Sequence, residues 1–186
     1  MIECQDVSFS YPASTLPDSE RQAGSALKHI SCTIEDGSFV LLCGTSGCGK
    51  TTMTRLFNGL IPHYHEGTYT GSVYLDGKDT RDLSLFDISL KVGSVFQNPR
   101  SQFFNVDTTS ELAFGPENHG MPEDIVRDRV KCVATQLKLE PLLDRSIFSL
   151  SGGEKQKIAC GSAAAIAPDV YVLDEPSSNL DAYAME

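Results

Sequence analysis

Apolar and polar residues alternate in several stretches of the chain, as they do in strands with one buried face. The pattern predicts a strand over residues 28–34, after a short N-terminal strand over 2–9, and the alternation recurs directly before Asp76-Gly77. An Asp-Gly pair after such a run is a strong hairpin signal. We therefore expect an antiparallel β-subdomain made of the N-terminal strands and the region near 68–92.

Other runs are apolar at nearly every position, which is typical of parallel strands covered on both faces. They are Phe39–Cys43 and Val170–Leu173, and a further strand is expected over Val92–Phe96. A polar stretch over 12–25 contains two prolines and a glycine and predicts an exposed loop.

Helical periodicity appears in two places. An amphipathic helix is predicted over Lys50–Leu60 and should end at Pro62, because Met53, Leu56, Phe57 and Leu60 share one face. A second helix should begin near Pro122, and its apolar face comprises Val126, Val130, Val133, Ala134 and Leu137. We interpret residues 98–165 as a mostly helical subdomain inserted into the α/β fold.

Composition and charge narrow the class of protein. The chain has 186 residues, enough for about one domain. Its formal net charge of −10 makes nucleic acid an unexpected partner. The apolar runs are far shorter than the ~20 residues of a membrane span, and the N-terminal residues do not resemble a signal peptide. Six cysteines without a C-x-x-C pair are expected to be reduced thiols used as small apolar residues.

The most specific motif lies between the first apolar run and the first helix, and reads Gly44-Thr45-Ser46-Gly47-Cys48-Gly49-Lys50-Thr51-Thr52. Glycines at this spacing let successive backbone N–H groups face one anion, and the following helix adds its positive dipole end. Lys50 can reach the outer phosphates of a nucleotide, and the Thr51 hydroxyl can bind Mg²⁺. The segment therefore predicts a phosphate-binding P-loop.

Two further segments carry polar chemistry. Asp174 and Glu175 follow an apolar strand, where one carboxylate can hold Mg²⁺ and the other can orient or deprotonate water. Ser151, Gly152 and Gly153 precede a helical stretch and could present N–H groups and a hydroxyl to an anion. Taken alone, this second segment is equally typical of an ordinary helix N-cap.

The order of these motifs, P-loop, LSGGEKQ, VYVLDEP and then Asn179–Asp181, resembles the nucleotide-binding subunit of ABC transporters. The resemblance implies ATP and Mg²⁺ as cofactors, with Tyr11 stacking on adenine. Residues Ser151, Gly152 and Gly153 would cap ATP held by a second ATPase domain. Asn179–Asp181 would be the D-loop at the interface between the two domains.

The same resemblance assigns the reaction. It implies Glu175 as the catalytic base, Lys50 on the phosphates, and Gln97 as the Q-loop glutamine near the membrane-subunit groove. Mg²⁺ would be held by Thr51, Gln97 and Asp174. The implied fold is a P-loop ATPase core with an antiparallel β-subdomain and an inserted α-helical subdomain.

A narrower resemblance, to energy-coupling factor transporter ATPases, rests on Val95–Pro99, Gln102–Phe104 and Ala113–Asn118. It implies uptake of a vitamin or a cobalt or nickel ion at the cytoplasmic face of the membrane. The implied partners are a transmembrane coupling protein and a substrate-binding membrane protein. The second ATPase domain could be identical, homologous or fused to this one.

One feature departs from the family: no histidine follows Asp181, although the family has a switch histidine after the D-loop. We therefore expect a C-terminally truncated domain with weak ATP hydrolysis. The alternatives are a soluble ABC-type ATPase not coupled to transport, a domain that binds without catalysis, and another P-loop protein such as a GTPase. No asparagine here is followed by lysine, as a guanine-reading motif requires.

Overall fold

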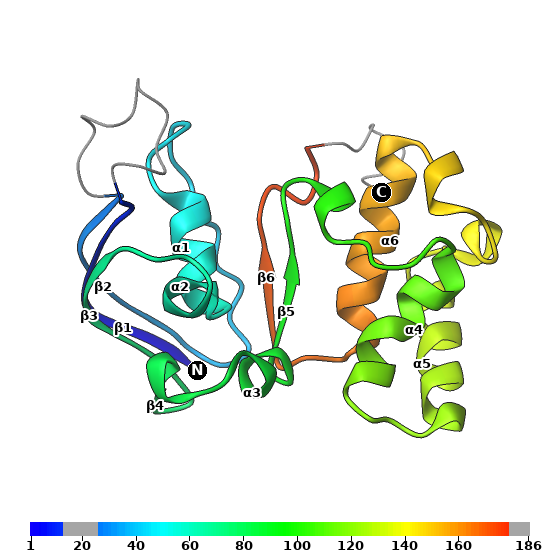
Figure 1. Cartoon of the computed structure of the whole chain (residues 1–186), viewed down its shortest axis with the longest axis horizontal. Helices are drawn as coiled ribbons and strands as arrows, with labels where there is room; N and C mark the ends of the chain where they lie inside the picture. The colour runs from blue at the N-terminus through cyan, green and yellow to red at the C-terminus, as the bar shows by residue number, and fades with distance from the viewer. Residues whose placement is uncertain (13–25, 179–186) are drawn as a thin grey trace. The chain divides into compact units, whose positions relative to one another are not determined.

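The computed structural model describes residues 1–12 and 26–178, in two compact units over Met1–Ser89 and Leu90–Glu186. Figure 1 labels their helices and strands. The expected loop over 12–25 falls almost entirely outside the described residues, and so does the expected D-loop over 179–181. Nowhere in the described part is there a helix long and apolar enough to cross a bilayer.

The first unit contains an antiparallel sheet with the strand order β2-β1-β3-β4. Its strands are β1 (Ile2–Ser10), β2 (Leu27–Ile34), β3 (Thr68–Leu75) and β4 (Lys78–Asp79). Asp76 and Gly77 both have positive φ, as a two-residue hairpin turn requires, and they join β3 to β4. The expected antiparallel pairing and the expected hairpin are thus confirmed.

The helices of the first unit differ from the prediction. Helix α1 (Lys50–Phe57) ends three residues early, because Gly59 adopts a left-handed φ of 74° at the start of α2 (Leu60–His63). Pro62 therefore lies inside α2 rather than at the end of one long helix. The 3₁₀ turn η2 (Thr80–Asp82) and helix α3 (Leu85–Ser89) follow β4 in the same unit.

The prediction of a buried strand at Phe39–Cys43 is wrong for the first unit. These residues form no strand, and the side chain of Phe39 is 91% exposed. A parallel strand needs parallel neighbours, whereas the sheet of this unit is entirely antiparallel. Strand β2 is also more exposed than its alternation suggested, since it lies at the edge of the sheet.

The second unit contains two parallel strands and a group of helices. Strands β5 (Val92–Val95) and β6 (Val170–Leu173) run in register from Val92 opposite Val170 to Val95 opposite Leu173. Its helices are α4 (Thr108–Asn118), α5 (Glu123–Gln136) and α6 (Gly152–Ala165). The 3₁₀ turn η3 (Pro99–Ser101) lies between β5 and α4, and the turns η4 (Glu140–Leu142) and η5 (Ile147–Ser149) lie between α5 and α6.

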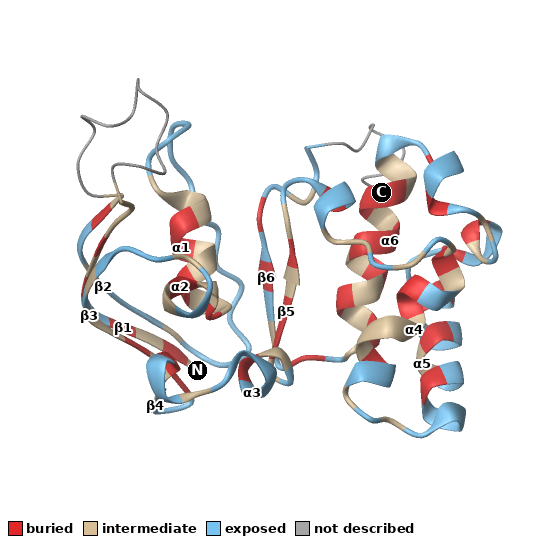
Figure 2. Ribbon diagram, viewed as in Figure 1, coloured by how far each residue is buried: buried red, intermediate tan, exposed pale blue. Residues whose placement is uncertain are grey.

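Burial in the second unit concentrates between its three long helices (Figure 2). Val126, Val130, Val133 and Ala134 are buried on α5 as predicted, whereas Leu137 lies beyond the end of that helix and is exposed. Gly161 lets α6 approach its neighbours, because a Cβ there would lie 2.7 Å from atoms of Leu112 and of Leu139.

The β6 strand is less buried than its apolar run suggested. Only Val172 is buried, while Tyr171 and Leu173 are exposed. Strand β5 ends at Val95 instead of Phe96, and its residues Val92 and Val95 are buried. The carboxyl ends of both strands lead directly into the polar segments that the sequence singled out.

Candidate functional site

The glycine-rich segment of the first unit is an exposed loop that leads directly into α1. Lys50 bends back over it, and its Nζ donates hydrogen bonds to the carbonyl oxygens of Gly44 (2.9 Å) and Thr45 (3.0 Å). Gly47 and Gly49 have positive φ values of 77° and 100°. The loop thus places a lysine ammonium beside the N-terminus of a helix, which is an arrangement suited to anions.

Position 49 requires glycine because of its close neighbours as well as its backbone angles. A Cβ at this position would lie 2.6 Å from the carbonyl oxygen of Ala26 and 2.9 Å from Cδ2 of Leu27. Glycine therefore lets the loop pack against the beginning of β2. No side chain caps α1 at Gly49. The first turn, which includes Thr51, is consequently not closed off by a protein capping group.

Tyr11 lies beside the first turns of α1. Its hydroxyl accepts a hydrogen bond from Nη1 of Arg55 (2.8 Å) and lies 3.4 Å from Oγ1 of the buried Thr52. The Arg55 guanidinium carbon is 5.9 Å from the centre of the Tyr11 ring. Phe9 and His65 meet the same ring edge-on, with centroids at 4.8 Å and 6.2 Å. Tyr11 is therefore held on several sides.

Arg55 and His65 are neighbours of Tyr11 that the sequence analysis missed. The only local signal was that Arg55 follows Thr52 by three residues on one helix, which places both side chains on one face. The pKa of His65 is lowered because the ring is partly buried and because Arg55 adds positive charge nearby. His65 consequently favours its neutral form at neutral pH.

In the second unit, the parallel strands bring Gln97 and Glu175 together. Nε2 of Gln97 donates a hydrogen bond to Oε2 of Glu175 at 2.8 Å, across 78 residues of sequence. The N–H of Asp174 donates to the carbonyl oxygen of Val95, so β5 and β6 stay paired up to this point. Asp174 is 8% exposed, while Glu175 is exposed and has a positive φ of 50°.

The predicted metal ligands are divided between the two units. Asp174 and Gln97 lie in the second, and Thr51 lies in the first. Carboxylate, amide and hydroxyl oxygens are suitable ligands for Mg²⁺, which usually takes few protein ligands and keeps several waters. The described residues contain no cluster of three or more His, Cys, Asp or Glu side chains placed to hold a metal.

Ser151 is the N-cap of α6 and forms a capping box with Glu154. Oγ of Ser151 accepts from the N–H of Glu154 (3.3 Å), and the N–H of Ser151 donates to Oε2 of Glu154 (2.7 Å). Arg145 supports Glu154 through a 2.9 Å ion pair. The segment therefore has the helix N-cap role that the sequence left open. Gly152 and Gly153 form the first turn of the helix.

Polar side chains also hold the backbone on both sides of Gln97, a role that the sequence did not indicate. Gln102 accepts from the N–H of Phe96 (3.2 Å) and donates to the carbonyl oxygen of Ser94 (3.1 Å). The buried carboxylate of Glu111 accepts from the N–H groups of Phe104 and Asn105. These bonds fix the backbone over 94–105.

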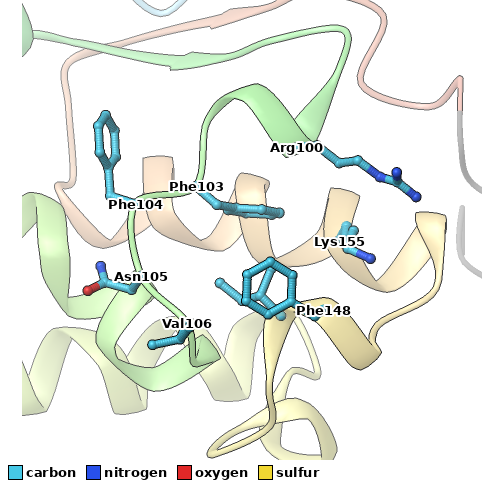
Figure 3. A pocket seen from close by; sticks show the side chains of 8 residues that line it. Arg100, Phe103, Phe104, Asn105, Val106, Phe148 and Lys155 are labelled. Atoms are coloured by element: carbon cyan, nitrogen blue, oxygen red, sulfur yellow. The ribbon is translucent and has the colours of Figure 1, made fainter.

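A cavity of about 540 Å³ lies next to this segment (Figure 3). The exposed Phe104 and Phe148 line it together with Arg100, Phe103, Asn105, Val106, Ile147 and Lys155. Lys155 is buried, and its Nζ donates to the carbonyl oxygen of Leu150 (2.6 Å). The cavity therefore combines aromatic side chains with two cationic groups.

A family model described as ABC transporter matches residues 27–178. Two proteins of Treponema denticola, named as ABC transporter ATP-binding proteins, are 49% and 45% identical over 186 residues, all of this chain. The chain covers 36% of each of them, so it spans about a third of these relatives. A protein of Pyrococcus horikoshii with a similar name is 41% identical over 186 residues, and the chain covers 63% of it.

Solved structures agree on the fold. CbiO1 of Clostridium perfringens, described as part of the ABC transporter complex CbiONQ, has a TM-score of 0.77 and 28% identity over 98% of this chain and 68% of its own. A dimeric bacterial ABC transporter cassette reaches 0.81 at 26% identity, over 100% and 78%. The same cassette in a post-hydrolysis dimer bound to ADP and Pi gives 0.81 at 25%, over 99% and 78%. The expected α/β P-loop fold class is confirmed.

The capping box predicts a pH-dependent contribution to stability. The N–H and the hydroxyl of Ser151, and then Arg145, lower the pKa of Glu154 below its ordinary 4.5. A carboxylate with a depressed folded pKa stabilises the fold above its unfolded pKa, and the contribution is lost as pH falls through the folded pKa. In urea unfolding at pH 7, Glu154→Gln should cost about 1 kcal/mol.

The difference in free energy of unfolding between the wild type and Glu154→Gln should disappear in a pH series that passes below the folded pKa of Glu154. Glu117→Gln is the control, because Glu117 is exposed near the end of α4, and it should change stability by less than about 0.5 kcal/mol. A cost of Glu154→Gln that stays constant from pH 7 down through acid pH would contradict this role of the carboxylate.

Proposed function

This chain belongs to the ABC transporter family, and we propose that it is the ATP-binding and ATP-hydrolysing part of an importer for a micronutrient, either a vitamin or a transition-metal ion. The observation that carries the ATP-hydrolysing part of the proposal is the pair formed by Gln97 and Glu175, beside Asp174, at the ends of two parallel strands. Import of a micronutrient is supported by the similarity to CbiO1, described as part of the CbiONQ complex. An exposed carboxylate held by an amide and adjacent to a possible Mg²⁺ ligand suits attack of water on a phosphate.

Nucleotide binding would use the glycine-rich loop. The Lys50 ammonium, now hydrogen-bonded to two loop carbonyls, can exchange these partners for phosphate oxygens, which form stronger charge-assisted bonds. Thr51, Gln97 and Asp174 would hold Mg²⁺, whose charge would offset that developing on the phosphates. Glu175 would take the proton of the attacking water, and Gln97 would hold that carboxylate in place.

The test of this proposal is Glu175→Gln. The amide keeps the size of the side chain but cannot accept a proton, so single-turnover hydrolysis of ATP with protein in excess should fall about 10²- to 10⁴-fold. ATP affinity, measured by calorimetry, should stay within about threefold, because Glu175 does not lie in the phosphate-binding loop. Undiminished hydrolysis in Glu175→Gln would rule out Glu175 as the base.

Adenine would stack on Tyr11. A stacking ring must be held in one orientation, and Tyr11 is held through its hydroxyl by Arg55 and at its edge by Phe9. Arg55 would therefore act as a positioning residue for the base, without touching the phosphates. Stacking of an aromatic side chain on a base is typically worth ~1–3 kcal/mol.

Arg55→Met should weaken ATP binding by about three- to tenfold, the range expected for losing one hydrogen bond that orients Tyr11. Binding of inorganic triphosphate, which has no base, should be unchanged, and both can be measured by calorimetry. The matched control is Arg127→Met, which removes only an exposed ion pair on α5. An equal loss of affinity for ATP and for inorganic triphosphate would refute the proposal that Arg55 acts through Tyr11.

A second ATPase domain would complete the site. Ser151, Gly152 and Gly153 lie at the N-terminus of α6, where they could contact the phosphates of ATP held by an opposing domain. In support, the structurally similar bacterial cassette is a dimer, and its post-hydrolysis form holds ADP and Pi. The partner domain could be identical, homologous or fused to this chain.

The membrane partner would be a transmembrane coupling protein that seats in the cavity at Phe104 and Phe148. Support comes from chain continuity, since η3 directly joins Gln97 to the segment that lines this cavity. Similarity to CbiO1, described as part of the CbiONQ complex, favours such a partner together with a substrate-binding membrane protein. The chain would then work at the cytoplasmic face of the membrane.

Phe148→Asp tests this contact. Phe148 is 77% exposed, so the change should leave the fold intact while placing a charge in the proposed interface. Recovery of the coupling protein, when both are expressed together and purified through a tag on this chain, should fall about tenfold. ATP affinity should not change, and Ile125→Asp, an exposed apolar position on α5 outside the cavity, should be neutral.

The second candidate function is a soluble ABC-type ATPase that is not coupled to transport. The same ATP chemistry would serve it, so the Glu175 experiment cannot separate the two. The Phe148 experiment does so, because an uncoupled ATPase would recover no membrane protein in either the wild-type or the variant purification.

A further inference from the structure

Two cysteines of the first unit lie directly opposite each other on neighbouring strands. In the antiparallel pairing of β1 with β2, Cys4 is the register partner of Cys32, between Glu3 opposite Thr33 and the irregularity that follows Cys4. Residues directly opposite in such a ladder point to the same face of the sheet. We propose that Cys4 and Cys32 form a redox-active pair that closes to a cross-strand disulfide on reaction with a low-molecular-weight disulfide.

The spacing of the strands permits this bond with a small movement. Opposite residues in an antiparallel pair have Cα atoms about 4.5–5.5 Å apart, within the range that disulfides span. Their Cβ atoms are about 4.5–5.5 Å apart, whereas a disulfide requires about 3.5–4.5 Å. The strands must therefore approach by roughly 1 Å. Since β2 is at the edge of its sheet, it has a strand on one side only and can make this shift.

The two thiols differ in the way that a reactive pair requires. Cys4 is 2% exposed, while Cys32 is exposed. Burial, and then the neighbouring Cys32, raise the pKa of Cys4 to about 12, so it is hardly ever a thiolate at neutral pH. The accessible Cys32 is therefore the first to react, and Cys4 is the resolving thiol beside it.

The chemistry proceeds by thiol–disulfide exchange. The Cys32 thiolate attacks one sulfur of the small disulfide, which expels one small thiolate and leaves a mixed disulfide on Cys32. Cys4 then loses its proton to solvent and attacks Sγ of Cys32, which expels the second small thiolate. Two protein thiols are oxidised to one disulfide, and one small disulfide is reduced to two thiols, so that electrons and protons balance.

The bond would link two strands that border the candidate nucleotide site. Strand β1 leads into Tyr11, and the beginning of β2 packs against Gly49 of the glycine-rich loop. The disulfide would close the chain between them into a loop and hold one strand against the other. Disulfides with less favourable geometry are the more easily reduced ones, so this link should be reversible.

The experiment uses the whole 186-residue chain, incubated with oxidised glutathione at neutral pH, quenched with acid and alkylated. Digestion with trypsin and a glutamate-specific protease cuts after Glu35, which separates Cys32 from Cys43 and Cys48. Mass spectrometry should find the Cys4 peptide linked to the Cys32 peptide, and dithiothreitol should release them. Oxidation should also raise the unfolding temperature by roughly 5 °C.

Serine variants separate the two steps. Cys4→Ser should accumulate the mixed disulfide on Cys32, because the resolving thiol is missing, and Cys32→Ser should leave Cys4 unmodified. The control Cys132→Ser, at an exposed position on α5, should behave like the wild type. A mixed disulfide that persists on Cys32 in the wild type, or links from Cys4 to other cysteines, would overturn the proposal. None of these readouts depends on ATP binding.

Discussion

The parallel register of β5 and β6 is the constraint on which the candidate chemistry of the second unit depends. Val95 lies opposite Leu173, so the two segments that follow these strands begin side by side. Nε2 of Gln97 consequently lies 2.8 Å from Oε2 of Glu175. A slip of one residue in this register would shift the two strand ends past each other and move these side chains apart. The backbone pairing of the strands therefore brings these polar groups within hydrogen-bonding distance.

In the first unit, close packing positions the glycine-rich loop and the Tyr11 ring. The glycine-rich loop packs closely on the start of β2 because Gly49 has no side chain, and Lys50 bends back over the loop carbonyls. Tyr11 is held by Arg55 on α1 and by Phe9 on β1. A preorganised loop and a fixed ring reduce the entropy that a ligand must lose on binding.

Polar side chains at and near the candidate site also have structural roles. Ser151 caps α6 through Glu154, yet the same helix end is where an opposing nucleotide would be met. Gln102 and Glu111 form hydrogen bonds with the backbone and hold it in place between Ser94 and Asn105. Substitutions at such positions change stability as well as activity, so that experiments on them need a measurement of folding alongside.

The sequence by itself predicted the candidate chemistry and most of the elements. The P-loop, the acidic strand end and the Asp76-Gly77 hairpin are local patterns, because a glycine spacing or a turn acts within a few residues. Tertiary structure alone decided the partners, such as Arg55 for Tyr11 and Cys32 for Cys4, since these depend on pairing between distant segments. For the same reason the apolar run at Phe39–Cys43 was misjudged: whether such a run is buried depends on the neighbouring strands, which its composition does not reveal.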